Sequence, residues 1–318
     1  DPKSDVATNY TISAVCETKV RKNCESQPAL GFIPLFLPIF AGGKPHGSVP
    51  PQAPKIMPYT VTLQLTPREA ADPARRTALA ARRIGLEETD IALVRVVKRS
   101  IDARRGAPKV NLTLELYDDR EPQPAPISFD YPSVAGRTEA VIVGSGPAGL
   151  FAALRLIEQG LRPILLERGR AVPERKRDIA QINRNGAVDP DSNYAFGEGG
   201  AGTFSDGKLF TRSKKRGDCN KVLRTLVFHG ADPAILYETH PHIGTDRLPR
   251  IISNIRRTIV DAGGTFLFEK RVTDFVVRKG RITGVVCGGQ TVEGAAVILA
   301  TGHSARDVYE LLHALIGG

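Results

Sequence analysis

Val-Ile-Val-Gly-Ser-Gly-Pro-Ala-Gly, residues 141–149, is the stretch of sequence that decides the fold. An apolar strand is predicted to end at Gly144, and a helix is predicted to run from Pro147 to Gln159. Glycines at 144, 146 and 149 allow a tight turn, close approach of a pyrophosphate to the backbone and close packing of helix on strand. The free N–H groups at the helix start, around Ala148, can hold the anion. The stretch therefore predicts a dinucleotide-binding unit.

The next strand is predicted over residues 162–167, so that strand, helix and strand fit within about thirty residues. Glu167 ends this strand, where a carboxylate can accept hydrogen bonds from both ribose hydroxyls of an adenosine. The carboxylate would also repel a 2′-phosphate, which disfavours NADP, although Arg168 and Arg170 beside it weaken that argument. The alternative is a glycine-rich turn that only joins a strand to a helix.

Two further segments separate FAD from NAD, since both cofactors use this unit. The apolar run Val297-Ile298-Leu299 ends in Ala300-Thr301-Gly302, which resembles the second nucleotide-contacting strand of flavoproteins of the glutathione reductase type. The glycine-rich stretch 197–209 removes side chains along one path, so that its backbone can approach a flat or phosphorylated ligand. The alternatives are a buried strand with a small-residue turn and a surface loop.

Composition places the chain among globular proteins. It has 318 residues, 41% of them hydrophobic and 25% charged, with a net charge of +10 that lies mainly in the glycine-rich part. The apolar stretch 30–41 is too short to span a bilayer. The four cysteines show neither zinc-site spacing nor a closely spaced redox pair. We expect no metal, no membrane partner and a location in the reducing cytoplasm.

Three segments are predicted along the chain. Residues 1–57 are proline-rich and read as a disordered, non-native leader, with the single methionine at its end as the natural start. Residues 58–130 are predicted to fold as strand, helix, strand and strand, which makes a small α+β module of the βαββ type. Residues 136–318 are predicted to be a Rossmann-like α/β FAD-binding domain that is incomplete at the C-terminus. Its later elements are expected at 219–229, 247–262, 265–269, 271–278, 281–287, 295–300 and 304–315.

Four motifs together resemble the uncharacterised bacterial FAD-dependent dehydrogenases with a glutathione-reductase-type fold. They are VIVGSGPAGL at 141–150, GEGGAGTFSDGKL at 197–209, HPHIGTD at 240–246 and ATG at 300–302. The resemblance implies that ribose meets Glu167, adenine meets the Val272 backbone, and the flavin side lies along 199–208. The implied cofactor-binding residues are Gly144, Gly146, Pro147, Ala148, Gly149, Glu167, Arg168, Gly199, Gly200, Ala201, Gly202, Val272, Ala300, Thr301 and Gly302.

Flavin chemistry requires a positive charge or dipole near N1 and O2 of the ring, and Lys208 is the candidate for that role. His240 and His242 are better explained as structural hydrogen-bonding residues. The predicted activity is that of an FAD-dependent oxidoreductase that moves a hydride between a small-molecule substrate and flavin N5, with NAD(P)H as one candidate electron donor. The basic stretch 208–221 leaves an RNA-modifying flavoprotein open, although few aromatics accompany it. A non-catalytic dinucleotide-binding module is the third alternative.

Overall fold

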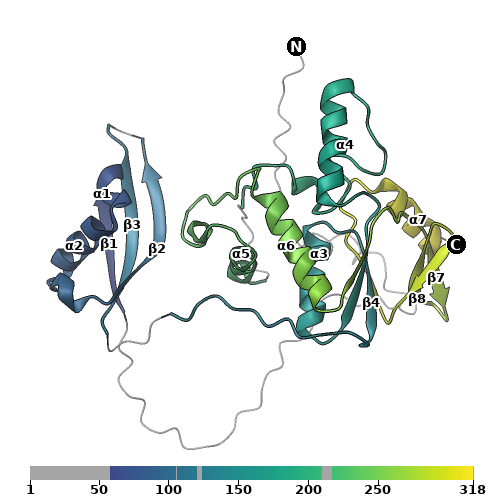
Figure 1. Ribbon diagram of the computed structural model, residues 1–318, viewed down its shortest axis with the longest axis horizontal. Coiled ribbons are helices and arrows are strands. Elements are labelled where there is room, and N and C mark those ends of the chain that lie inside the picture. Colours follow the sequence, from purple (N-terminus) through teal and green to yellow (C-terminus); the bar gives the residue numbers. More distant parts are fainter. Residues whose placement is uncertain (1–57, 105, 120–123, 210–216, 318) are drawn as a thin grey trace, which may run out of the picture. The chain divides into compact units, whose positions relative to one another are not determined.

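A computed structural model describes residues 58–104, 106–119, 124–209 and 217–317 (Figure 1). These residues form two compact units. The small unit holds the described residues between 58 and 127 together with residues 233–241, and the large unit holds the described remainder. Because residues 233–241 belong to it, the small unit is discontinuous in sequence, which the sequence did not lead us to expect. The expected leader, 1–57, lies outside the described residues.

The small unit is a three-stranded antiparallel sheet with two helices packed on one face. Its elements are β1 (Tyr59–Leu65), α1 (Pro67–Ala71), α2 (Pro73–Ile84), β2 (Leu93–Asp102) and β3 (Lys109–Tyr117), and the strand order is β1-β3-β2. Alternate residues of β1 and β3, such as Leu63 and Leu114, form its core, as the period of two along a strand requires. Thr66 and Asp72 cap α1 and α2 with their side chains; α2 is the helix expected after Pro73, and α1 is an additional short helix before it.

Residues 233–241 lie along β2, an edge strand of this sheet. The Arg99 N–H donates to the Tyr237 carbonyl at 2.8 Å, and the Thr239 N–H donates to the Arg99 carbonyl at 3.0 Å. The two backbones run parallel at this bridge. The segment thus acts as a short additional strand partner for β2.

The large unit is built on a four-stranded parallel sheet of order β10-β4-β5-β6. Its strands are β4 (Glu139–Val143), β5 (Arg162–Leu166), β6 (Thr265–Leu267) and β10 (Val297–Leu299). The second sheet is antiparallel, with β7 (Val272–Arg278), β8 (Arg281–Cys287) and β9 (Gln290–Glu293). The helices are α3 (Pro147–Glu158), α4 (Val172–Asn185), α5 (Cys219–Phe228), α6 (Leu248–Asp261) and α7 (Arg306–Gly317).

The parallel sheet is covered on both faces, with α3 and α6 on one side and β7, β8 and α7 on the other (Figure 1). Val141 and Val143 pack with residues of β7, β8 and α7, whereas Ile142 faces α3. A strand buried on both faces reads as a continuous apolar run, which is why 139–143 shows no alternation. The predicted α/β fold with a Rossmann-like parallel sheet is confirmed.

Most of the predicted elements of the large unit are present with shifted ends. The strand expected at 295–300 is shorter, and the final helix begins two residues later than expected. Helix α4 and strand β9 were not predicted. In the part of the chain that the structure describes, no helix has the length and apolar character that crossing a membrane would require.

Candidate functional site

Three glycine-containing segments converge where β4 ends, and hydrogen bonds between their backbones hold them together. The Gly199 N–H donates to the Ser145 carbonyl at 2.9 Å, which joins the stretch 197–202 to the loop 144–149. The Ala300 N–H donates to the Val143 carbonyl at 2.8 Å. The structure therefore brings together the three segments that the sequence selected.

The three glycines of the loop 144–149 differ in how much space surrounds them. A Cβ atom on Gly149 would lie 1.9 Å from the Gly144 carbonyl oxygen, so α3 could not pack this closely on the turn with any other residue there. Gly144 has φ +102°, and a Cβ there would lie 2.5 Å from the Ala300 oxygen. A Cβ on Gly146 would have its nearest neighbour, Cα of Gly200, at 3.8 Å. Gly144 and Gly149 serve packing, whereas a Cβ on Gly146 would make only an ordinary van der Waals contact.

Helix α3 begins directly after Gly146. Gly146 is its N-cap and Pro147 its first residue, and no side chain caps it. The N–H groups of Ala148 and Gly149, in the first helical turn, have no partner within the helix and favour an anion. A Cβ on Gly200 would lie 3.1 Å from Gly146 Cα and 3.3 Å from Pro147 Cδ, so the second segment closes over the first. These donors fit a pyrophosphate.

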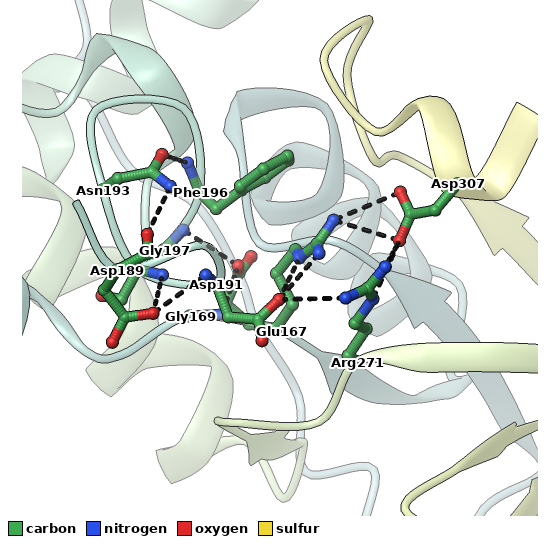
Figure 2. A network of polar contacts seen from close by, with 11 residues as sticks. Glu167, Gly169, Asp189, Asp191, Asn193, Phe196, Gly197, Arg271 and Asp307 are labelled. Carbon is green, nitrogen blue, oxygen red and sulfur yellow. Dashed lines mark hydrogen bonds and ion pairs between the residues drawn. The ribbon is translucent and has the colours of Figure 1, made fainter.

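Glu167 lies at the end of β5 and is 5% exposed. One carboxylate oxygen accepts from the Ser145 N–H at 2.8 Å and from the Ser145 hydroxyl at 2.9 Å. The other accepts from the N–H groups of Gly169 and Gly197, both at 3.0 Å (Figure 2). A carboxylate offers about four acceptor positions, so Glu167 fastens the two glycine-rich segments together. A ribose hydroxyl would have to share or replace one of these donors, and the Ser145 hydroxyl is the one that can rotate away.

Arg168 belongs to a cluster of charges beside Glu167. Its guanidinium contacts Asp191 at 2.7 Å and Asp307 at 3.2 Å, and it lies over the ring of Phe196. Arg271 reaches the same two carboxylates, Asp307 at 2.9 Å and Asp191 at 3.7 Å (Figure 2). The cluster links the loop after α4 to α7 and to the start of β7. Arg168 is thus engaged in ion pairs next to the expected ribose position.

A small pocket of about 170 Å³ opens beside this cluster. Its lining is mostly charged and comprises Arg168, Gly169, Arg170, Asp189, Asp191, Ser192, Glu269 and Arg271. Val272, the expected adenine contact, begins β7 directly after this lining and is 4% exposed. The Lys270 N–H donates to the Glu167 carbonyl at 2.9 Å, so the start of β7 lies next to Glu167.

The remaining predicted residues lie at the rim of the convergence or away from it. Ala201 and Gly202 form a short 3₁₀ turn with Gly200, and Thr301 and Gly302 follow β10. Lys208 is 79% exposed, and its ammonium lies 3.3 Å from Asp206. The backbone of Lys208 pairs with that of His242, whereas His240 belongs to the small unit. The catalytic role of Lys208 stays a prediction.

Two buried charged residues of this region were not found from the sequence. Arg175 and Glu198 are both 0% exposed and lie beneath the glycine-rich turn. Glu198 lies inside the GEGG motif, in which the cofactor contacts were predicted for the residues that follow it, and Arg175 lies in the unpredicted helix α4. Burial raises the pKa of Glu198, against the lowering effects of the Val172 N–H and of Arg256.

Comparison with known proteins identifies relatives of both units. Residues 138–311 match the family model described as pyridine nucleotide-disulphide oxidoreductase, and residues 57–117 match a domain of unknown function, DUF8436. An uncharacterised protein of Clostridium beijerinckii is 37% identical over 248 residues, which cover 73% of this chain and 46% of that protein. The thiamine thiazole synthase of Aeropyrum pernix is 25% identical over 185 residues, 53% of this chain and 56% of that enzyme.

Among solved structures, that of THI4 from Thermovibrio ammonificans is similar, with 20% identity and a TM-score of 0.37 over 57% of this chain and 63% of that one. The chain spans about half the length of the curated relatives described above. Since the oxidoreductase model matches more than half of the chain, the predicted resemblance is confirmed, and the chain belongs to the pyridine nucleotide-disulphide oxidoreductase family.

Proposed function

We propose that the large unit binds FAD and that the protein transfers a hydride between a small-molecule substrate and N5 of the flavin. Membership of an oxidoreductase family supports this proposal. The observation that carries it is the uncapped helix start at Gly146, where a Cβ would clash with no protein atom, within a loop whose other glycines are tightly packed. A turn that only joined a strand to a helix would not require glycine at that residue.

Each segment has a distinct role in this proposal. The N–H groups of Gly146, Ala148 and Gly149 hold the pyrophosphate, with Gly144 and Pro147 shaping the turn. Glu167 and Arg168 meet the ribose, and the Val272 backbone meets the adenine. The segments Gly199–Gly202 and Ala300–Gly302 provide backbone on the flavin side.

A bound flavin supplies a two-electron acceptor at N5 and becomes an anion at N1 and O2 when reduced. Lys208 is the proposed positive charge for that anion, and its ion pair with Asp206 must open for this role. Because the pair is exposed, opening it costs little. The proposed hydride donor to the flavin is either a small organic molecule or NADH or NADPH, and the reduced flavin then passes its two electrons to a second acceptor.

The substitution Gly146→Ala tests cofactor binding directly. Its Cβ fits the protein without ligand, because the nearest atom lies 3.8 Å away and the backbone of Gly146, at φ −68°, is open to alanine. The same methyl group would occupy the space of the pyrophosphate. We expect the wild type to quench FAD fluorescence on binding, and we expect G146A to bind FAD at least about tenfold more weakly with an unchanged melting temperature. Wild-type protein that cannot take up FAD, or equal affinity in G146A, would contradict the proposal.

A further inference from the structure

Arg175 of α4 is a fully buried arginine whose guanidinium donates four hydrogen bonds to one short segment. Its guanidinium donates to the carbonyls of Asn193 at 3.0 Å, Tyr194 at 3.1 Å and Glu198 at 2.7 Å, and to the Thr203 hydroxyl oxygen at 2.9 Å. These acceptors span residues 193–203. One side chain therefore holds the backbone of the glycine-rich stretch from within.

The glycine-rich stretch is shaped to receive this side chain. A Cβ on Gly197 would lie 2.3 Å from Arg175 Cδ, so the glycine leaves room for the arginine stem. The Thr203 hydroxyl donates to the Glu198 carbonyl at 2.8 Å while it accepts from Arg175. The guanidinium thus fills the interior of the turn and satisfies its inward-facing oxygens.

The side chain of Glu198, a residue of the same stretch, contacts two helices outside that stretch. One carboxylate oxygen accepts from the Val172 N–H at 2.8 Å, at the start of α4. The other lies 3.0 Å from Arg256 Nε of α6. The turn is therefore attached to two helices of the large unit.

Burying a guanidinium is costly unless its donors are satisfied, and removing one partner leaves the others unpaired. Arg175 is therefore expected to hold residues 197–203 in a single conformation. In that conformation Gly199 donates to the glycine loop and Gly200 closes over Gly146.

We infer that Arg175 is a positioning residue that preforms the turn Gly199–Gly202, so that the flavin half of FAD binds without having to order this backbone. This inference rests on the proposed function, since the turn is assigned to the flavin side there. Preformed sites bind more tightly because less conformational entropy is lost on association.

The test compares FAD with ADP in Arg175→Lys. Lysine keeps the charge but has three donors on a single nitrogen and cannot serve acceptors spread over the turn. ADP contacts only the glycine loop and the Glu167 side of the site, whereas FAD also uses the turn. We expect the Kd for FAD to rise at least about tenfold and the Kd for ADP to change less than about twofold. Arg177→Lys is the matched control, an exposed arginine of the same helix, and should change neither value.

Thr203→Val is the second variant, in case R175K does not fold. It removes one acceptor of Arg175 and should produce the same split with a smaller change in FAD affinity. Equal loss of FAD and ADP, or unchanged FAD affinity in both variants, would overturn the inference. If wild-type protein binds neither ligand, the proposed function fails. Amide hydrogen exchange at 197–203 then decides about Arg175, because R175K should exchange faster than R177K, and equal rates would refute the positioning role.

Discussion

The two units of this chain are held together by different means. In the small unit the interior is apolar, with alternate residues of β1 and β3 facing two capped helices. The polar and charged side chains that are buried, among the described residues, all lie in the large unit: Ser145, Glu167, Arg175, Ser192, Glu198, Thr203, Thr225 and His229. Six of these eight lie between 145 and 203, around the converging glycine segments.

The difference shows that the contacts that stabilise a core and the contacts that shape a loop are of different kinds. An apolar interior tolerates much variation in detail, because the hydrophobic effect is non-directional. A buried charge or hydroxyl must have its hydrogen-bond partners in place. The large unit therefore uses directional contacts to fix irregular backbone around the proposed cofactor site, whereas the core of the small unit is apolar.

The largest effect is expected when the same change, glycine to alanine, is made in both units. In Gly149→Ala the new Cβ would overlap the Gly144 carbonyl oxygen, so α3 must move. We expect a loss of about 3 kcal/mol or more in the free energy of unfolding of the large unit, together with weaker FAD binding, measured by denaturant unfolding and fluorescence quenching.

Gly85→Ala is the counterpart in the small unit. Gly85 ends α2 with φ +74°, and among the described residues no atom lies within 4 Å of a Cβ there. The expected cost is about 1 kcal/mol, from the left-handed backbone alone. Equal losses for the two substitutions would remove the contrast between the units.

The second effect concerns pH and a buried histidine of the large unit. Burial lowers the pKa of His229 below its usual 6.5, and its ring nitrogens contact Thr225 O at 2.7 Å and Thr258 Oγ1 at 3.1 Å. Below pH 6.5 this histidine is protonated in the unfolded chain, whereas in the folded chain it stays neutral until the pH reaches its lowered pKa. His229 therefore stabilises the fold above pH 6.5, and this stabilisation is lost as pH falls through the lowered pKa.

His229→Gln should flatten this dependence, measured as the free energy of unfolding between about pH 7 and pH 5. A single proton contributes at most about 1.4 kcal/mol per pH unit. The matched control is His313→Gln, since His313 is exposed on α7, and it should keep the wild-type slope. A wild-type slope in H229Q would show that other groups govern the acid sensitivity of this unit.

The smallest effect is expected at an ion pair of the small unit. The exposed Arg104 contacts the half-buried Asp102 at 2.9 Å, and hydrogen bonds from Arg104 lower the pKa of Asp102 to about 2. Arg104→Ala should raise that pKa toward its ordinary value of 3.8 in an NMR titration. The denaturation midpoint should move little, because ion pairs near the surface contribute little to stability and two residues only two positions apart can also pair in the unfolded chain. A clear loss of stability would show that directional contacts matter in the small unit as well.

Hydrophobic periodicity predicted most strands and helices, and its failures have physical causes. The buried face of α4 carries Val172, Arg175 and Ile179, so an arginine occupies the middle of what would otherwise be an apolar stripe. Pro173 at its start and Gly186 at its end were the signals that remained. Strand β9 follows Gly288 and Gly289, both with positive φ, and a Gly-Gly pair between strands is typical of a two-residue hairpin.

In the candidate site, the motifs located the converging segments but not what supports them. Spacing of glycines is a local property, so the sequence shows where 144–149, 197–202 and 300–302 lie. The contacts from Arg175, Glu198 and Arg168 join residues far apart in the chain, and each of these side chains resembles an ordinary surface charge in the sequence. The predicted ribose role of Glu167 remains a prediction, and its four bonds to the protein were not foreseen.

The pairing of residues 233–241 with β2 has a consequence for handling the small unit by itself. An open edge strand offers unpaired N–H and C=O groups to other chains and invites aggregation. The backbone carbonyl of Arg99 accepts a hydrogen bond from Thr239, 140 positions later. Thr239 lies far outside the stretch 57–117 that matches a domain model. A fragment limited to that stretch would expose this edge, and we expect it to self-associate, whereas supplying residues 233–241 as a separate peptide should keep it monomeric.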